Sequence, residues 1–514
     1  MNAIELSLFA HRLNAICDEM GAVLRRTALS PNIKDREDYS CALFDAAGEL
    51  VAQAAHIPVH LGSMAYCMRD VVSRLDWHAG DVVVFNDPFL GGTHLPDITL
   101  VAPLFDAGEL LGFTASRAHH ADVGGVTPGS MGVHEHLADE GVVISPVHWW
   151  RQGNEDVSCL ADFMQRVRNP DERLADLAAQ RAACLSGVRR LLDINSSMPC
   201  RTGFAELLHS SEAYGRQAVA SIPDGVYRFS DVLEDDGMGT LDLPVCVNIH
   251  IAGDSALVDF SGTAVQCRGP VNCPISVTAA AVFYAFRCLM PPHTPQTSAI
   301  FRCIELSAAQ GSMVNASPGA AVAAGNVETS QRIVDVVLGA LAQAIPERIP
   351  AAAQGTMNNV IFSGGSQACG WVYYETLGGG MGAHAAGDGL SALQCHMTNT
   401  RNTSIEVLEM HYPLRISEYT VRRDSGGKGL YRGGDGLCRE WQAMANCQVS
   451  LLGERRRTAP YGLYGGGSGK SGRNLLLRNG VQSELPAKAS IKLAKGDRLR
   501  IETPGGGGFG KGDT

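Results

Sequence analysis

Hydrophobic and polar positions follow a helical period over four stretches of the chain, a period that is typical of amphipathic helices. These stretches are residues 4–27, 160–192, 275–290 and 329–345. Asn169-Pro170 interrupts the second stretch, and because proline ends a preceding helix we expect two helices there. Thr329 or Ser330 is the expected N-cap of the last helix.

Short apolar runs bounded by turn residues predict strands in other parts of the chain. The expected strands are residues 41–44, 50–52, 82–85, 98–105, 245–251 and 256–260. From about residue 415 the chain is strand-rich and glycine-rich, and Arg478-Asn479-Gly480-Val481 predicts a two-residue hairpin turn.

The alternation of helical and strand patterns predicts a mixed fold, α/β or α+β, with several domains. The chain has 514 residues, of which 45% are hydrophobic, and this length suggests about three domains with sizeable cores. We expect an N-terminal metal-site domain over residues 1–200, a central mixed α/β domain over 201–414 and a strand-rich C-terminal domain over 415–514.

Charge and cysteine usage limit the class of protein. The formal net charge of −11 argues against nucleic acid as a partner, because neutralising phosphates requires basic patches. The fifteen cysteines are scattered singly, which fits reduced thiols in a cytosol. We find neither a signal peptide nor a stretch of membrane-spanning length, so the expected location is the cytoplasm, without a membrane partner.

The 58 glycines exceed the usual share of about 7% and cluster at 378–382, 426–436 and 465–472. We interpret these clusters as turns that need positive φ. Gly378–Gly382 lacks both the Lys-Ser/Thr ending of a phosphate-binding loop and the spacing of a dinucleotide fingerprint, so this chain is not expected to bind ATP itself. The run Arg455-Arg456-Arg457 is interpreted as a solvated or intersubunit face.

Two clusters of imidazole and carboxylate groups lie close together in the chain. The first reads Gly-Gly-Thr-His94-Leu-Pro-Asp97 and the second Ala-His119-His120-Ala-Asp122-Val-Gly-Gly, and nine of the sixteen histidines fall between residues 56 and 148. Neutral imidazole and carboxylate suit Zn²⁺, Mn²⁺ or Fe²⁺, and three protein ligands leave coordination positions open for water or substrate. The sequence therefore predicts an open metal site.

The third ligand is either His119 or His120. Alternation along a strand sends neighbouring side chains to opposite faces, so only one of the two can bind the metal. The other histidine and Asp122 would then orient a ligand or move a proton.

Several longer blocks resemble the hydantoinase B/oxoprolinase family, and they span nearly the whole chain. In the first half they are Asp35-Arg-Glu-Asp38-Tyr-Ser-Cys-Ala-Leu-Phe-Asp45, His56-Ile-Pro-Val-His60-Leu-Gly-Ser-Met64, Asn86-Asp-Pro-Phe-Leu-Gly-Gly-Thr-His94 and His119-His-Ala-Asp-Val-Gly-Gly125. In the second half they are Gly325-Asn326-Val-Glu328-Thr-Ser330-Gln331-Arg332, Gln354-Gly-Thr-Met-Asn358-Asn359, Met397-Thr-Asn399-Thr and Tyr431-Arg-Gly-Gly-Asp435-Gly.

This resemblance implies a catalytic subunit that works in a hetero-oligomer with an ATP-binding hydantoinase A-like subunit. Together they would open cyclic amides such as hydantoins or oxoproline, or carboxylate ketones. Relatives that carboxylate acetone hold a divalent metal through a His, Asp and His set, which falls here on His94, Asp97 and His119. We favour the ring-opening branch, because this chain is much shorter than the acetone carboxylase subunit.

In the expected reaction the partner phosphorylates the substrate carbonyl, and the metal lowers the pKa of bound water so that hydroxide forms at the activated carbon. Asp122 or His120 would accept the water proton. The polar side chains beside apolar segments are candidates for binding substrate or the partner, with helix capping and turn formation as the alternative. These side chains are Asn326, Glu328, Asn358 and Asn359.

Three other functions fit the same residues. A ketone carboxylase subunit would incorporate labelled bicarbonate into its product. A mononuclear iron oxygenase would use two histidines and one carboxylate for Fe²⁺, and an ATP requirement without oxygen uptake would exclude it. A non-catalytic subunit would use its metal only to hold a fold or an interface.

Overall fold

The computed structural model describes residues 1–54, 57–365 and 370–512. His56, one of the histidines counted above, lies outside these residues. Within the described ranges the chain forms four β-sheets together with α-helices, so the expected mixed fold is confirmed. None of the helices described there combines the length and hydropathy that crossing a membrane requires.

The first sheet contains the strands that carry His94, Asp97 and His119 or lead to them. Its strands are β1 (Tyr39–Asp45), β2 (Leu50–Gln53), β3 (Val82–Phe85), β4 (Asp97–Asp106), β5 (Glu109–His119), β6 (Val147–Arg151) and β7 (Asn154–Glu155). Their order is β2-β1-β5-β4-β3-β6-β7, and every pairing is antiparallel.

Helices and short helical turns surround this sheet. They are α1 (Ala3–Thr27), α2 (Pro31–Lys34), α3 (Pro58–Ser73), η1 (Pro128–Ser130), α4 (Leu137–Glu140), η2 (Val157–Leu160), α5 (Ala161–Arg166), α6 (Pro170–Asn195) and α7 (Cys200–Ala220). The expected break at Asn169-Pro170 is confirmed, since α6 begins at Pro170. Proline is favoured at the first helical position because its missing N–H has no partner to lose there.

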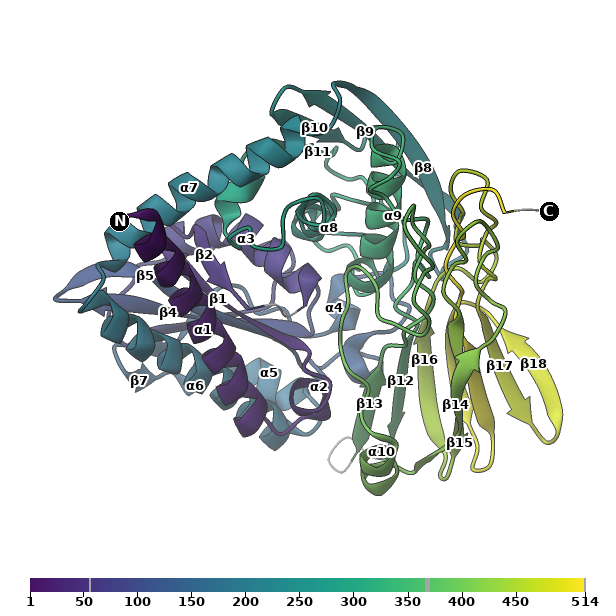
Figure 1. Ribbon diagram of the computed structural model, residues 1–514. Coiled ribbons are helices and arrows are strands. Elements are labelled where there is room, and N and C mark those ends of the chain that lie inside the picture. Colours follow the sequence, from purple (N-terminus) through teal and green to yellow (C-terminus); the bar gives the residue numbers. More distant parts are fainter. Residues whose placement is uncertain (55–56, 366–369, 513–514) are drawn as a thin grey trace.

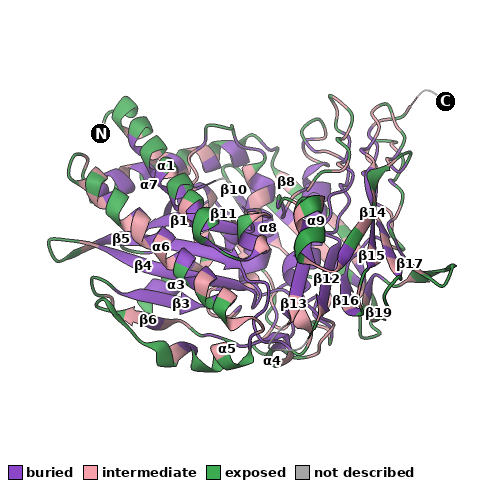
Figure 2. Ribbon diagram, turned by 90° about the horizontal axis from the view of Figure 1, so that it is seen from below, coloured by how far each residue is buried: buried purple, intermediate pink, exposed green. Residues whose placement is uncertain are grey.

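Both faces of the first sheet are buried, which explains why its strands are apolar at consecutive positions. Cys41 and Leu43 share a core cluster with α1, whereas Ala42 and Phe44 pack with α3. Figure 2 shows the strands of this sheet as buried while the outer faces of the helices are exposed. The sheet is therefore a rigid central layer.

The second sheet and its helices follow in the chain. They are β8 (Gly225–Asp235), β9 (Leu241–Ala252), β10 (Ser255–Asp259), α8 (Ile275–Arg287), η3 (Ser298–Phe301), β11 (Ile304–Ser307), η4 (Gly325–Thr329) and α9 (Ser330–Leu341), with the strand order β11-β10-β9-β8. Figure 1 shows α8 and α9 between the first sheet and the C-terminal strands.

The expected N-cap at Thr329 or Ser330 is wrong. A π-helical turn, η4, precedes α9 without a break, so both residues lie inside a continuous helical segment. The Thr329 hydroxyl donates to the Val271 carbonyl and the Ser330 hydroxyl to that of Asn326. Such π-helical turns are frequent at functional sites.

The remaining strands form two sheets that pack face to face. They are β12 (Asn359–Gly364), β13 (Trp371–Glu375), β14 (Leu414–Arg422), β15 (Gly436–Ala443), β16 (Cys447–Leu452), β17 (Arg473–Arg478), β18 (Val481–Leu485), β19 (Lys488–Leu493) and β20 (Arg498–Glu502), with the helix α10 (Ile405–His411) before β14. The strand orders are β13-β12-β16-β19 and β14-β15-β20-β17-β18. Phe362 and Trp441 meet in the core between the two sheets, with ring centroids 5.5 Å apart.

The predicted hairpin is confirmed, because Arg478 pairs with Val481 and both Asn479 and Gly480 have positive φ. The three-domain division stays a prediction. The sheet β13-β12-β16-β19 joins strands from both sides of residue 414.

The interpretation of the glycine clusters as positive-φ turns is wrong. Among the clustered glycines, all within the described chain, only Gly465 has positive φ. Instead, backbone contacts backbone: a Cβ at Gly506 would lie 1.9 Å from the Met381 carbonyl oxygen, and one at Gly433 would lie 2.0 Å from that of Gly506. Glycine is required here because any side chain would push these segments apart.

The interpretation of Arg455-Arg456-Arg457 as a solvated face is also wrong. Arg455 is buried, and its Nη2 lies 2.7 Å from carboxylate oxygens of both Asp231 and Asp335. Arg456 donates to Asn358 Oδ1, and only the Arg457 side chain is half exposed. A charge run in the sequence does not show where acidic partners lie, and here two of them wait in the core.

Candidate metal centre

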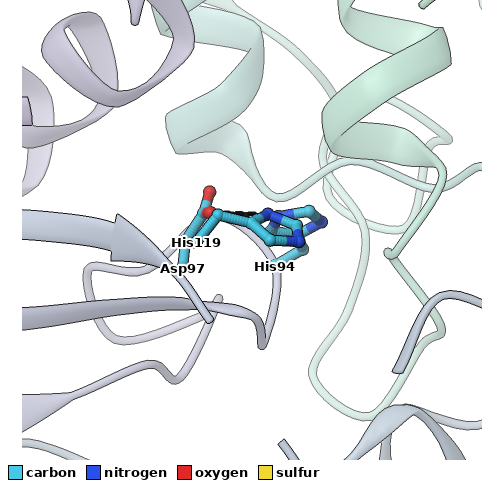
Figure 3. Close-up of side chains that lie close together, drawn as sticks. All are labelled: His94, Asp97 and His119. Atoms are coloured by element: carbon cyan, nitrogen blue, oxygen red, sulfur yellow. Dashed lines mark ion pairs between the residues drawn. The ribbon is translucent and has the colours of Figure 1, made fainter. Parts of the chain in front are cut away.

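Asp97 and His119 meet because of strand register. Asp97 is the first residue of β4, His119 is the last residue of β5, and the two lie directly opposite each other in the antiparallel pair. His94 belongs to the turn just before β4, where its carbonyl accepts a hydrogen bond from the Asp97 N–H. Figure 3 shows the three side chains gathered at the ends of the two strands.

The ligand atoms of these residues converge on one point. Asp97 Oδ1 lies 3.2 Å from His94 Nε2 and 3.3 Å from His119 Nδ1, and all three residues are buried. An ion held ~2.1 Å from each ligand atom keeps neighbouring ligand atoms roughly 3.0–3.4 Å apart. The spacing of the three atoms therefore fits a divalent cation.

The two oxygens of Asp97 have different surroundings. Oδ2 accepts from Thr93 Oγ1 at 2.6 Å and from Asn326 Nδ2 at 3.3 Å, and it lies 3.1 Å from His60 Nε2. Oδ1 and His94 Nε2 are buried without a hydrogen-bond partner among the described residues. Buried polar atoms are nearly always satisfied, so this pair of atoms indicates a missing cation.

The tautomer of His94 is set by a backbone carbonyl. His94 Nδ1 lies 3.3 Å from the Ala323 carbonyl oxygen, and because a carbonyl only accepts, Nδ1 carries the proton. The Nε2 lone pair then faces Asp97. Glu140 holds this carbonyl's segment by accepting from the Val322 and Ala323 N–H groups. Metal-binding histidines are commonly fixed in this way.

The electrostatics of the cluster keep its acid ionised. Burial raises the pKa of Asp97, but His94 and His60 lower it well below its usual range. Burial lowers the pKa of His94, but the Asp97 carboxylate raises it by more. Burial also holds the pKa of His119 below its usual value, which favours the neutral imidazole that a metal requires.

Two of the predicted substrate-binding residues connect to His119 through Tyr374. The Tyr374 ring stacks on that of His119 with centroids 4.7 Å apart, and its hydroxyl donates to Asn359 Oδ1 at 2.8 Å. Asn359 Nδ2 in turn donates to Glu328 Oε1, and burial raises the pKa of Glu328 to about 8. This chain of contacts fixes the position of the His119 ring.

The other two predicted substrate-binding residues have different positions. Asn326, on the π-helical turn η4, contacts the cluster directly through Asp97. Asn358 does not reach the cluster: it donates to Gln354 Oε1 and accepts from Arg456 Nη2.

The structure does not bring His120 or Asp122 to the cluster. His120 points to the other face of the strand, where its Nε2 lies 2.9 Å from Gln180 Oε1 on α6, and burial lowers its pKa to about 4. The Asp122 carboxylate accepts from the N–H groups of Gly124 and Gly129 and pairs with Arg168. Their expected part in proton transfer stays a prediction.

His60 was missed in the sequence as a site residue. It lies on the first turn of α3 with its Nδ1 3.3 Å from Ser40 Oγ and its Nε2 beside Asp97. Its only sequence signal was membership of a resembling block, without a metal-ligand spacing. His60 and Asp38 line a cavity of about 20 Å³ at the cluster, which is large enough for about one water molecule.

Thr93→Val is expected to weaken metal binding ~10–100-fold, the usual cost of losing a group that orients a ligand. The valine keeps the shape of threonine but removes the hydrogen bond to Asp97 Oδ2. Chelator competition with Zn²⁺ and Mn²⁺ measures the affinity. Thr114→Val is the matched control, because the Thr114 hydroxyl donates to the Cys184 carbonyl instead. Equal affinities for the two variants would contradict the role of Thr93.

Comparison with known proteins places this site in a family. The model of the hydantoinase B/oxoprolinase family matches residues 2–512. The chain belongs to the hydantoinase B/oxoprolinase family. The relationship expected from the sequence blocks is thereby confirmed.

Two relatives show how the family uses this length of chain. An uncharacterized protein of Methanocaldococcus jannaschii is 40% identical over 99% of this chain and 91% of its own length. A 5-oxoprolinase of Dictyostelium discoideum is 37% identical over 100% of this chain but only 41% of its own length. The chain thus spans about two fifths of that 5-oxoprolinase.

Two solved structures share the fold. The ATP-dependent caprolactamase from Pseudomonas jessenii superposes with a TM-score of 0.93 and 28% identity, over 99% of this chain and 91% of that chain. Acetone carboxylase in a nucleotide-free structure has a TM-score of 0.89 and 18% identity, over 99% of this chain and 76% of that chain. The second likeness concerns the fold alone.

Proposed function

We propose that this chain is the catalytic subunit of an ATP-dependent hydrolase of cyclic amides. It binds a divalent cation, Mn²⁺, Zn²⁺ or Fe²⁺, through His94 Nε2, Asp97 Oδ1 and His119 Nδ1. A separate hydantoinase A-like subunit binds ATP and activates the substrate. The observation that carries the proposal is the pair of buried, unpartnered ligand atoms, Asp97 Oδ1 and His94 Nε2, beside His119.

Amides resist water because resonance makes the carbonyl carbon a poor electrophile. Phosphorylation of the carbonyl oxygen removes this protection. Water then adds to the carbon, the C–N bond of the ring breaks, and the ring nitrogen takes a proton; a second water splits the resulting acyl phosphate into carboxylate and phosphate. A divalent cation at the cluster supplies a Lewis acid and lowers the pKa of water.

The side chains around the cavity hold the reacting groups in place. Thr93, Asn326 and His60 fix Asp97 so that only Oδ1 is available as a ligand. Tyr374 packs against the His119 ring. Among the described residues, Asp38 and His60 are the acidic and basic side chains, besides the three ligands, that line the cavity, and the geometry favours them over His120 and Asp122 for proton transfer.

The need for a partner follows from relative lengths and from the glycine clusters. The 5-oxoprolinase relative is more than twice as long as this chain, so it contains sequence that a second polypeptide would supply here. A Cβ at Gly380 would lie 2.0 Å from the Gly434 carbonyl oxygen, so that glycine cluster is filled by protein and leaves no space for a phosphate. The proposed complex is therefore a hetero-oligomer.

Ring opening is expected to require three components together: this chain, its ATP-binding partner and ATP. The purified chain with Mn²⁺ or Zn²⁺ alone should show no turnover of 5-oxoproline or hydantoin, because the amide is not activated. Chromatographic detection of the opened product and of ADP measures both halves of the reaction. Turnover without ATP would contradict the proposal, and so would incorporation of labelled bicarbonate or uptake of oxygen.

A further inference from the structure

A second and larger cavity, of about 280 Å³, lies between α3, α8 and the segment that leads into η3. It is lined by Leu50, Gln53, Pro58, Gly62, Ala65, Ala280, Phe283, Tyr284, Arg287, Gln296, Thr297, Ile300, Phe301 and Asn399. Its volume lies at the lower end of the range for small-molecule sites, whereas the cavity at the metal cluster holds about one water.

The two cavities share their walls. Pro58 lines the larger cavity while its neighbours Ile57 and Val59 line the smaller one. Asn399 likewise lines the larger cavity, and the residues on either side of it, Thr398 and Thr400, line the smaller one. The larger cavity is therefore separated from the metal cluster by the thickness of one chain segment.

The apolar part of the larger cavity suits a small flat ring. Phe283 and Phe301 stack with centroids 4.3 Å apart and an interplanar angle of 5°. Small residues leave the space beside them: a Cβ at Gly62 would lie 2.5 Å from Ala280 Cα, so α3 and α8 are in direct contact next to the cavity.

Two polar atoms of the larger cavity have no partner. Thr297 is 1% exposed, and its Oγ1 makes no hydrogen bond to the described residues. Gln53 Oε1, on the end of β2, is likewise buried and unpartnered. An acceptor at Gln53 and a donor at Thr297 match the N–H and C=O of an amide.

Arg287 supplies a positive charge at the same cavity. Its guanidinium donates to the carbonyls of Pro291, Pro292 and Thr294. No carboxylate of the described residues lies within ion-pair distance of it. A half-buried guanidinium without an acidic partner favours an anionic ligand, and a carboxylate matches its geometry.

We propose that the larger cavity binds a small cyclic amide that carries a carboxylate. The ring packs against the stacked phenylalanines, the amide lies between Gln53 and Thr297, and the carboxylate faces Arg287. The inference rests on the proposed function, because it makes this cavity the substrate site of that reaction. It adds the substrate class: a cyclic amide with an acid group, in preference to a neutral lactam.

Calorimetric titration of the full-length chain with 5-oxoproline, without metal, ATP or partner, tests the proposal. The wild-type chain is expected to show saturable binding, and Thr297→Val to bind at least tenfold more weakly. Thr294→Val is the matched control, with binding within twofold of wild type. The Thr294 hydroxyl is equally buried and unpartnered, but Thr294 is not a lining residue. Because neither hydroxyl has a protein partner to lose, both variants should fold.

A second comparison tests the acid group. 2-Pyrrolidinone has the same ring as 5-oxoproline without the carboxylate, so Arg287→Gln should reduce 5-oxoproline binding to the level of 2-pyrrolidinone and leave 2-pyrrolidinone binding unchanged. Absence of 5-oxoproline binding by the wild-type chain, or equal affinity in the two threonine variants, would overturn the proposal.

The two proposals fail in different ways. A chain that binds 5-oxoproline as described but opens no ring with partner and ATP supports the cavity and refutes the proposed function. A complex that opens the ring with an unchanged KM in Thr297→Val supports the proposed function and refutes the cavity.

Discussion

His119→Gln is expected to remove bound metal from the purified chain, whereas His120→Gln is expected to keep it. The two histidines are adjacent and both buried, but they point to opposite faces of β5. His119 Nδ1 lies 3.3 Å from Asp97 Oδ1, and its loss leaves two protein ligands. Ring opening by the complex should fall by more than the ~10–100-fold that loss of an orienting group costs. Metal content by mass spectrometry, after loading and desalting, gives the result.

His120→Gln is the control for general damage to the fold. It disturbs the contact with Gln180 and should cost about 1–3 kcal/mol of stability, the range for a buried polar group left unsatisfied. Retention of metal by His119→Gln, or its loss from a folded His120→Gln chain, would reverse the assignment of the two histidines.

The second large effect concerns stability. Gly506→Ala is expected to destabilise the chain by about 3 kcal/mol or more, since overpacking that moves backbone exceeds the usual range for inserted methyl groups. The new Cβ would lie 1.9 Å from the Met381 carbonyl oxygen and 2.3 Å from its carbon, so the neighbouring backbone must shift. Denaturant unfolding measures the difference.

Gly387→Ala is the matched control for Gly506→Ala. A Cβ at Gly387 meets only the His384 ring, at 3.6 Å, and the residue has no positive φ. Its stability should stay within about 0.5 kcal/mol of wild type. Similar effects of the two alanines would show that the glycine packing does not matter for stability.

The local pattern of the sequence was enough to predict most elements near the site. The helix over residues 4–27, the break at Asn169-Pro170 and the hairpin at Asn479-Gly480 all depend on neighbouring residues only. For the same reason the pattern was wrong where distant parts meet. Arg455 is buried because Asp231 and Asp335 lie beside it, and neither acid is near it in the chain.

The choice between His119 and His120 shows this limit most clearly. At the turn between β4 and β5, Asp106 pairs with Glu109 and Phe105 with Leu110. A bulge then shifts the register, so that Leu104 pairs with Gly112 and Asp97 with His119. Without the bulge Asp97 would lie opposite Ala118, and the two histidines would exchange faces. No residue pattern in this hairpin indicates the bulge.

His60 was missed for a related reason. It approaches Asp97 from α3, and its contact depends on how that helix packs on the sheet. Residue type and spacing identified His94, Asp97 and His119 as candidates, because three ligand types in two short turns suffice for that inference. The groups that orient them come from separate elements, and only the folded chain brings them together.

X-ray absorption spectroscopy of the metal-loaded chain, together with anomalous diffraction from its crystals, tests the central claim most directly. We predict one ion within about 2.0–2.3 Å of His94 Nε2, Asp97 Oδ1 and His119 Nδ1, the range of metal–ligand bonds to nitrogen and oxygen. An ion held by other residues, or none after loading with Mn²⁺, Zn²⁺ and Fe²⁺, would contradict it.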